Sequence, residues 1–523
     1  MKLRSVDLAL EREWIAKGWW TDDSLGSLLH QGLGAHGDEP FTVRSSVRPY
    51  VATLAVVREQ ALTLAQGLRD RGVGQGDVVG FQLPNWVEAA YVFYAAAFLG
   101  AVVMPVVHFY GPKEVGYILR KTPPKAFVTF DRFGALSGTT TLLASGAPQP
   151  ELVAVVGDDP SGYEPLEAWF GAGVLDRPAD VDPSSPALIA YTSGTTSDPK
   201  GVVHTHRTIG FEVRQLSSAQ PTKAPPSIVG APVGHGIGML AALLIPAVQG
   251  KPIHLIDVWD PGWILQQMAE EELMSGTGAT YFLTSLLDHP TFDPEVHIPL
   301  MRYIGLGGAA VPAAVAERAT AMGISIVRMY GSTEHPSITG STHDDPLEKR
   351  AGTDGHPLDG CEIRLAADGE IESRGPDCFA GYTDADLTAT VFDADGWYRT
   401  GDIGVLDDDG YLTITDRKSD VIIRGGENVS AAEVEGVLAH IDGVLECAVV
   451  AAPDARFGEH ACAFIRGTPP SMQDVQAAMA AAGLARQKWP EEIRAIADFP
   501  RTPSGKVQKF VLRKQLREEA VGG

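Results

Sequence analysis

The sequence YTSGTTSDPKG (residues 191–201) determines how the rest of the chain is interpreted. An apolar run over 187–190 precedes it and predicts a short buried strand. The composition that follows is typical of a phosphate-binding loop, because glycines let the backbone approach an anion, hydroxyls donate hydrogen bonds and a lysine adds positive charge. It is not a Walker loop, since Lys200 precedes Gly201 instead of following a glycine. The alternative is a solvated turn rich in Ser, Thr and Gly.

Length and charge exclude several classes of protein. A chain of 523 residues is too long for one core and predicts several domains. Its 66 acidic and 42 basic residues give a net charge of −24, which is unfavourable for binding nucleic acid or an anionic membrane. The four cysteines form no C-x-x-C pair and no metal-ligand spacing with histidine; they are Cys361, Cys378, Cys447 and Cys462. We therefore expect reduced thiols in a cytoplasmic protein.

One uncharged stretch, residues 89–107, is long enough to suggest a membrane span. Gly100 and Pro105 interrupt it, and its composition changes from Ala and aromatic residues to Val. We interpret it as a buried helix up to Leu99, a turn at Gly100 and then a strand. The N-terminus (residues 1–4) leads into a charged segment without an apolar signal core, so we expect no stable membrane insertion.

The order of helical and strand patterns predicts an α/β fold with two domains. A helix over 54–71, a strand over 77–83 and a helix over 86–99 indicate layers around a largely parallel sheet. Further strands are expected over 125–130, 152–156, 187–191, 301–306 and 324–329. Hairpins are predicted at Asp368-Gly369 and Asp409-Gly410, the second of which explains the acidic run 407–410 better than a calcium loop does. We expect a large N-terminal domain of layered sheets and helices (1–416) and a small mobile α+β C-terminal domain (417–523), with helices over 431–440 and 472–482 and a strand over 444–451.

Several motifs accompany the loop at residues 191–201. They are GGAA (307–310), YGSTE (330–334), YRTGD (398–402), DRKSD (416–420), RGGENV (424–429) and PRTPSGKV (500–507). The YGSTE motif follows a predicted strand, which places it at the usual ligand edge of an open α/β sheet. In this order the motifs resemble those of the adenylate-forming superfamily, which contains acyl-CoA synthetases, peptide-synthetase adenylation domains and beetle luciferases.

The resemblance implies roles for individual residues. Tyr330 lies against adenine, Asp402 accepts hydrogen bonds from the ribose hydroxyls, and Arg417 contacts ribose or phosphate. Mg²⁺ is held by Glu334 and Thr192, and these two residues with Lys506 form the catalytic set. The implied ATP-binding residues are Thr192, Ser193, Gly194, Thr195, Thr196, Lys200, Gly308, Ala309, Tyr330, Gly331, Ser332, Thr333, Glu334, Asp402, Arg417 and Lys506.

The same resemblance places a hinge and a thiol channel near the domain boundary. The hinge residue is Ser419, where the family commonly has Asp or Lys. The CoA channel is implied for the hairpin Arg424, Gly425, Gly426, Glu427 and Asn428, because paired glycines allow a thin backbone turn beside a ligand.

The acid pocket is expected around the segment VGHGIGM (233–239). The implied pocket residues are His235, Gly236, Gly238 and Gly307. His235 has an alternative interpretation as a buried histidine bonded to the backbone. No acidic residue occurs between Gln215 and His254, which argues against an amino acid because its amine needs a carboxylate partner. Glycines and small apolar residues favour a ring-containing acid or a medium- to long-chain fatty acid.

The function implied is that of an ATP-dependent acid–CoA ligase that uses ATP, Mg²⁺ and CoA. An apolar carboxylic acid is converted to acyl-AMP with release of pyrophosphate, and the acyl group is then transferred to CoA. One alternative is an acyl-AMP ligase that loads a carrier protein; another is a luciferase-type oxygenase. A non-catalytic nucleotide-binding regulator is disfavoured because Lys506 and Glu334 are both present. The oligomeric state is left open, with a homodimer as one option.

Overall fold

The computed structural model describes residues 3–192, 199–219, 224–308, 311, 313–425, 427–454, 456–501 and 507–522. Its largest sheet has eight strands in the order β18-β9-β8-β4-β3-β5-β6-β7. The strands are β3 (Val78–Gln82), β4 (Val102–Val106), β5 (Ala126–Phe130), β6 (Leu152–Val156), β7 (Glu164–Pro165), β8 (Pro186–Thr192), β9 (Lys200–Thr205) and β18 (Gly381–Tyr382). The pairs from β8 to β7 are parallel, whereas β9 and β18 add antiparallel at one edge. The predicted α/β class is confirmed.

Helices cover both faces of this sheet because its strands are apolar on both sides. Along β4, Val103 faces the core shared with α3 and α4, while Val102 and Met104 face the core shared with α5. The helices of the first 219 residues are α1 (Leu8–Ala16), α2 (Leu25–Ala35), α3 (Leu54–Asp70), α4 (Val87–Phe98), α5 (Pro112–Lys121), α6 (Gly138–Ala144), the 3₁₀ turn η1 (Leu166–Trp169) and α7 (His206–Ala219). Every residue of α4 is buried, which fits its lack of a polar face.

The stretch that resembled a membrane span is part of this core. It forms helix α4, a left-handed turn at Gly100 (φ +66°) and strand β4, as predicted. In the described part of the chain, none of the helices combines the length and apolar composition that crossing a membrane requires.

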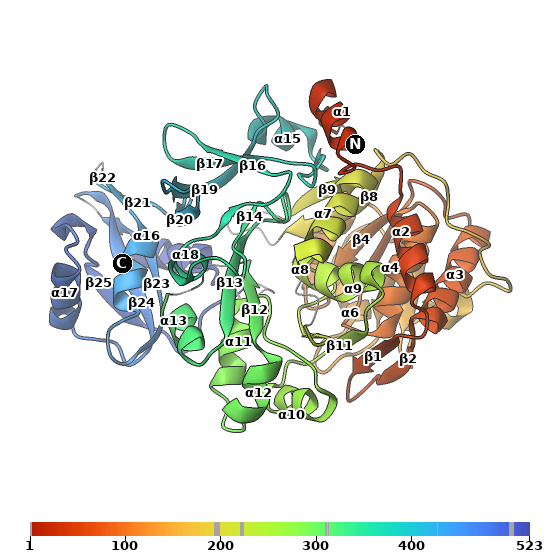
Figure 1. Cartoon of the computed structure of the whole chain (residues 1–523), viewed down its shortest axis with the longest axis horizontal. Coiled ribbons are helices and arrows are strands. Elements are labelled where there is room, and N and C mark those ends of the chain that lie inside the picture. The colour runs from red at the N-terminus through yellow and green to blue at the C-terminus, as the bar shows by residue number, and fades with distance from the viewer. Residues whose placement is uncertain are drawn as a thin grey trace.

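Three four-stranded sheets complete the large N-terminal region (Figure 1). The first orders β10 (Ile228–Val229), β11 (Ile253–Ile256), β1 (Pro40–Arg44) and β2 (Tyr50–Thr53). The second orders β12 (Tyr303–Gly307), β13 (Ser325–Tyr330), β14 (Thr339–Gly340) and β15 (His356–Pro357). The third orders β16 (Glu362–Leu365), β17 (Glu370–Arg374), β19 (Tyr398–Leu406) and β20 (Leu412–Arg417), and it contains both predicted hairpins.

The helices between residues 236 and 391 pack around these sheets. They are α8 (Gly236–Met239), the π-helical turn η2 (Leu240–Leu244), α9 (Ile245–Gln249), α10 (Pro261–Glu271), α11 (Thr280–Leu287), α12 (Pro294–Leu300), α13 (Ala313–Ala321), α14 (Leu347–Gly352) and α15 (Ala385–Val391). The acidic hairpin tip at residues 407–410 forms ion pairs with Lys349, whose Nζ lies 2.6 Å from carboxylate oxygens of Asp407 and Asp409. This contact agrees with a hairpin tip at this position.

The C-terminal region is a separate α+β unit at one end of the molecule (Figure 1). Its sheet orders β22 (Glu427–Val429), β21 (Ile422–Arg424), β24 (Gly458–Gly467) and β23 (Val444–Asp454), with β25 (Glu492–Ala495) paired to β24. Helices α16 (Ala431–Leu438), α17 (Met472–Ala481), the 3₁₀ turn η3 (Arg486–Lys488) and α18 (Lys509–Gly522) accompany it. A large N-terminal and a small C-terminal domain are therefore confirmed as the fold class, and the boundary at residue 416 stays a prediction.

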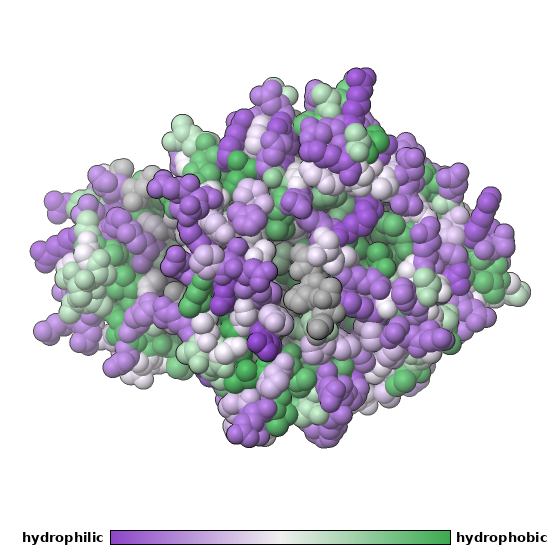
Figure 2. Space-filling view, viewed as in Figure 1, coloured by the Kyte–Doolittle hydropathy of each residue, from purple (hydrophilic) through white to green (hydrophobic). Residues whose placement is uncertain are grey.

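The surface and the cysteines agree with the composition. Figure 2 shows hydrophilic residues over most of the viewed face, with apolar residues scattered among them. All four cysteines are free, three of them buried, as expected of reduced thiols.

Candidate active site

The proposed phosphate loop connects two antiparallel strands, β8 and β9. Thr192 at the end of β8 pairs with Lys200 at the start of β9, so the strands hold the two ends of the loop together. Ser193, Gly194, Thr195 and Thr196 lie outside the described residues, and their phosphate-binding role stays a prediction. Lys200 Nζ lies 5.5 Å from the centre of the Tyr382 ring, and both residues line a cavity of about 300 Å³. A cation is thus held beside a cavity at the loop.

Three motifs that are distant in sequence meet at Tyr330. The Tyr330 hydroxyl donates a 2.8 Å hydrogen bond to Oδ2 of Asp402, and Nε of Arg417 lies 3.6 Å from Oδ1 of Asp402. Asp402 and Arg417 are cross-strand partners in β19 and β20, and Gly401 supplies the left-handed turn (φ +77°) before Asp402. Burial and the neighbouring Asp402 raise the pKa of Tyr330, so its hydroxyl stays a donor. The grouping provides an aromatic face, a short acceptor and a cation in one place.

The turn after β13 is held by backbone contacts on both sides. A Cβ at Gly331 would lie 1.8 Å from the carbonyl oxygen of Pro336, so the chain can close here only with glycine. The amide of Ser332 donates to the carbonyl of His335 at 2.9 Å. The carbonyl of Thr333 bonds to Nε2 of His204 at 2.8 Å. These contacts fix the direction of the next side chain, that of Glu334.

Glu334 is buried, and its side chain has a hydrogen-bond partner among the described residues. Its Oε1 accepts a 2.8 Å hydrogen bond from the hydroxyl of Tyr382. Burial and the neighbouring Glu334 raise the pKa of Tyr382, which keeps the hydroxyl protonated as a donor. A carboxylate held in this way offers hard oxygen atoms of the kind that Mg²⁺ prefers.

The glycines of the expected acid pocket differ in their surroundings. Gly308 has a left-handed backbone (φ +77°), and a Cβ there would lie 2.7 Å from Cδ1 of Ile237, so the residues after β12 lie against α8. Gly236 has open space around its Cα, whereas a Cβ at Gly238 would lie 2.0 Å from the carbonyl oxygen of Pro232. Gly307 is similarly close to backbone, with Met329 O 2.8 Å from a Cβ position. Close backbone packing therefore explains Gly238 and Gly307, and Gly236 alone of the three borders space.

His235 precedes the first turn of α8, and its side chain forms no capping bond. Desolvation lowers its pKa to about 4, so the imidazole is neutral at physiological pH. The structure thus agrees with an uncharged wall residue. Ala309, which follows Gly308, lies outside the described residues.

The hinge segment is tied to both domains. The Ser419 side chain is exposed, and its neighbour Lys418 places Nζ 2.7 Å from Asp368 and 2.8 Å from Glu370. On the C-terminal side, Asp420 forms a 2.6 Å ion pair with Arg513 of α18.

The expected CoA hairpin is a hairpin in the structure. β21 and β22 pair antiparallel with Arg424 opposite Glu427, and Gly425 has a left-handed backbone (φ +60°). The Arg424 guanidinium lies 4.1 Å from the Phe457 ring centre and forms a 2.6 Å ion pair with Glu491. Gly426 lies outside the described residues, and the side chain of Asn428 is likewise not described. Figure 1 places this hairpin at the upper edge of the C-terminal region, far from β8 and β9.

Lys506 also lies outside the described residues, so its catalytic role stays a prediction. The residues that flank its loop, Arg501 and Val507, form an isolated β-bridge, which brings the two ends of the loop together. Helix α18 begins two residues after Val507.

Comparison with known proteins identifies the family. Residues 32–383 match the AMP-binding enzymes, and residues 433–506 match the AMP-binding enzyme C-terminal domain. The chain belongs to the AMP-binding enzyme family. The resemblance to adenylate-forming enzymes inferred from the motifs is thereby confirmed.

Curated members of this family match the chain over nearly all its length. The medium-chain fatty-acid–CoA ligase of Escherichia coli (strain K12) is 32% identical over 521 residues, covering 96% of this chain and 92% of its own. A 3-[(3aS,4S,7aS)-7a-methyl-1,5-dioxo-octahydro-1H-inden-4-yl]propanoyl:CoA ligase of Rhodococcus jostii (strain RHA1) is 33% identical, with 89% and 94% coverage. The crystal structure of ATP-bound MatB from Rhodopseudomonas palustris superposes with a TM-score of 0.82 at 27% identity, covering 95% of this chain and 100% of that one.

Two residues of this family member were missed by sequence reasoning. Tyr382, which binds Glu334 and lies beside Lys200, belongs to the short edge strand β18. His204, which binds the Thr333 carbonyl, lies in β9. Their contacts arise from the sheet order β18-β9-β8, which joins segments 180 residues apart. No local sequence pattern predicts this pairing.

Proposed function

We propose that the protein is an ATP-dependent acid–CoA ligase that forms an acyl-AMP and then transfers the acyl group to CoA. The observation that carries the proposal is the meeting of Tyr330, Asp402 and Arg417 beside Glu334, in a chain that matches CoA ligases over nearly its full length. Tyr330, Asp402 and Arg417 come from three separate motifs. Together they suit an adenosine whose ribose carries charged phosphates.

ATP would lie across the edge formed by these motifs. Tyr330 offers an aromatic face to adenine, and Asp402 offers its carboxylate to the ribose hydroxyls. Arg417, 3.6 Å from Asp402, can reach ribose or the α-phosphate. We assign to Lys200 and to the hydroxyl-bearing residues of the loop at 192–196 the binding of the β- and γ-phosphates.

Glu334 and Thr192 fit a magnesium ion. Both present oxygen atoms, and the Glu334 carboxylate is already held by Tyr382. Mg²⁺ bound there supplies positive charge that offsets the phosphate oxygens.

The first half-reaction needs positioning and charge rather than proton transfer. A carboxylate oxygen of the acid attacks the α-phosphorus, the bond to the bridging oxygen breaks, and pyrophosphate leaves. We assign to Lys506 the neutralisation of charge at the α-phosphate and the attacking oxygen. In the second half-reaction the CoA sulfur loses its proton to solvent and attacks the acyl carbon, and AMP leaves with the former carboxylate oxygen.

The acid is proposed to be apolar, either ring-containing or a medium- to long-chain fatty acid. The neutral His235, Ile237 and the open space at Gly236 support an uncharged pocket next to Gly308. Of the two relatives named above, one is a ligase for a medium-chain fatty acid and the other a ligase for a fused-ring propanoate.

CoA as acceptor requires that the C-terminal domain moves. The hairpin formed by β21 and β22 lies far from β8 and β9 (Figure 1), so we expect a thiol channel to form only after rotation about the segment that contains Ser419. The boundary at residue 416 is supported by the end of β20 at Arg417 and by the separate sheet that begins with β21. A pivot at Ser419 would leave Lys418 paired with Asp368 and Glu370 of the large domain, and Asp420 paired with Arg513 of the C-terminal domain. A cytoplasmic location and a homodimer remain predictions.

The test is acid-dependent pyrophosphate release across a panel of fatty, alicyclic and amino acids, with and without CoA. We expect release with the apolar acids only, and acyl-CoA by mass spectrometry when CoA is added. Accumulation of acyl-AMP that CoA does not consume would instead indicate loading of a carrier protein.

A further inference from the structure

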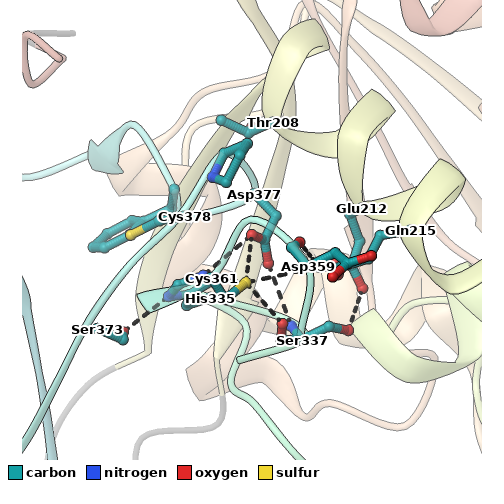
Figure 3. Close-up of polar contacts among 12 residues, drawn as sticks. Thr208, Glu212, Gln215, His335, Ser337, Asp359, Cys361, Ser373, Asp377 and Cys378 are labelled. Atoms are coloured by element: carbon teal, nitrogen blue, oxygen red, sulfur yellow. Dashed lines mark hydrogen bonds and ion pairs between the residues drawn. The ribbon is translucent and has the colours of Figure 1, made fainter. Parts of the chain in front are cut away.

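A second cluster of reactive side chains lies directly behind the Tyr330–Glu334 turn. It consists of His335, Cys361 and Asp377, contributed by three loops of the large domain (Figure 3). His335 and Asp377 are fully buried and Cys361 is 7% exposed. None of the three is used in the nucleotide site described above.

The donor atoms of this cluster have the spacing of metal ligands. Nε2 of His335 lies 3.1 Å from Oδ1 of Asp377, and Sγ of Cys361 lies 3.6 Å from that nitrogen and 3.5 Å from that oxygen. Zinc binds His nitrogen and carboxylate oxygen at about 2.0–2.2 Å and thiolate sulfur at about 2.3 Å, so ligands at tetrahedral angles lie roughly 3.3–3.6 Å apart. All three separations match a tetrahedral edge within about 0.2 Å.

A buried carboxylate of helix α7, Glu212, lies beside Asp377 but outside the closely spaced group of three donors. The Glu212 side chain is fully buried, and its Oε1 accepts a 2.7 Å hydrogen bond from the Ser337 hydroxyl. Its Oε2 is buried without a hydrogen-bond partner among the described residues.

Surrounding groups orient the donors as an outer shell of a metal site does. Nδ1 of His335 is hydrogen-bonded to the Ser373 hydroxyl at 2.8 Å, which fixes the ring with Nε2 toward Cys361 and Asp377. The backbone amide of Ser337 reaches the second oxygen of Asp377 at 3.4 Å. Nε2 of Gln215 lies 3.7 Å from the Cys361 sulfur, and that sulfur lies 3.2 Å from the carbonyl oxygen of Ser337.

We propose that His335, Cys361 and Asp377 bind a zinc ion, with the Glu212 carboxylate as a neighbouring negative group beside Asp377. Nitrogen, sulfur and oxygen donors at these separations suit Zn²⁺. Binding of Zn²⁺ replaces the thiol proton of Cys361, which passes to solvent. The site joins the three loops that carry His335, Cys361 and Asp377 and so stiffens the turn next to Glu334.

Sequence spacing could not indicate this site. Cys361 is 26 residues from His335 and 16 from Asp377, and Glu212 is more than a hundred residues from all three. No cysteine and histidine have the sequence spacing of a metal site. In the folded chain, however, Cys361 and His335 lie close together.

The test measures zinc binding by the full-length protein without nucleotide or magnesium. We expect one zinc per chain by elemental analysis after exchange into metal-buffered solution, and a Tm that falls when a chelator removes the metal. Cobalt substitution should give a thiolate-to-metal charge-transfer band, which reports the cysteine ligand without any mutation.

Two alanine variants of buried cysteines form a matched pair. Cys361→Ala should lose the charge-transfer band and bind zinc at least about 10-fold more weakly. Cys378→Ala, next to Asp377 in sequence but outside the donor set, should keep both. A wild-type protein that binds no stoichiometric zinc and gives no cobalt band, or a Cys361→Ala variant that retains both, would overturn the proposal in favour of a purely hydrogen-bonded cluster.

Discussion

The hydrogen bond from Tyr382 to Glu334 offers a direct test of how the magnesium ligand is positioned. Tyr382→Phe removes one hydroxyl from a buried site and leaves the ring that packs against Phe379 and faces Lys200. A hydrogen bond to a charged group contributes about 1.5–3 kcal/mol. If Glu334 acts only in adenylation, this loss should lower kcat/KM for ATP by roughly 10- to 150-fold in that half-reaction.

The assay separates the two half-reactions. Pyrophosphate release reports adenylation, and conversion of supplied acyl-AMP to acyl-CoA reports thioester formation, which should proceed at close to the wild-type rate. Tyr94→Phe is the matched control, because it removes an equally short hydrogen bond (2.8 Å, to the carbonyl of Leu243) in helix α4. Tyr94→Phe should lose some stability and keep adenylation, whereas Tyr382→Phe should lose adenylation. Equal activity of the two variants in pyrophosphate release would refute the positioning role of Tyr382.

Three further predictions concern pH, packing and the C-terminal lysine. Burial lowers the pKa of His204 to about 4, below its ordinary value of 6.5, so the stability it contributes is present above pH 6.5 and is lost as the pH falls toward 4. The loss of folding stability amounts to about 2 kcal/mol at pH 5. Denaturant titrations should show a smaller loss in His204→Gln and the full loss in the exposed control His440→Gln. Equal acid sensitivity of the two variants would contradict this role of His204. Gly238→Ala should lower the free energy of unfolding by about 1–3 kcal/mol or more, because the added Cβ meets the Pro232 carbonyl. Gly236→Trp, in contrast, should fold and should raise KM selectively for the largest accepted acid. Unchanged Tm in Gly238→Ala, or a KM effect of Gly236→Trp that is the same for all acids, would count against this view of the pocket. Lys506→Ala should slow adenylation about 10²–10³-fold and spare transfer from supplied acyl-AMP, and comparable losses in both steps would exclude the assigned role.

Most of the large sheet could be predicted because its elements carry strong local signals. Residues 152–156 form an uninterrupted apolar run and give β6 with the predicted bounds, and α4 ends one residue before the position expected from Gly100. Both hairpins follow from Asp-Gly turns, which favour the left-handed conformation that Gly369 and Gly410 adopt.

The motifs predicted a nucleotide site at Tyr330, Asp402 and Arg417, and the structure brings these three residues together, while their roles toward ATP stay predictions. What sequence reasoning missed depends on contacts between distant segments. Tyr382 reaches Glu334 only because β18 adds to the edge of β9, and neither strand contains a signal for that pairing. Gly238 was assigned to the pocket from its motif, and its contact with the Pro232 carbonyl becomes visible only in three dimensions.

The central claim is that the acid is activated by direct attack on the α-phosphorus of ATP. The measurement that tests it most directly uses a carboxylic acid labelled with ¹⁸O in its carboxylate, together with ATP, Mg²⁺ and CoA. Transfer through acyl-AMP leaves one labelled oxygen on AMP, because the acyl carbon departs to sulfur while the attacking oxygen stays on phosphorus. We predict AMP that is heavier by one ¹⁸O atom, formed in step with acyl-CoA and unlabelled pyrophosphate. Label in inorganic phosphate, or unlabelled AMP alongside acyl-CoA, would contradict the mechanism.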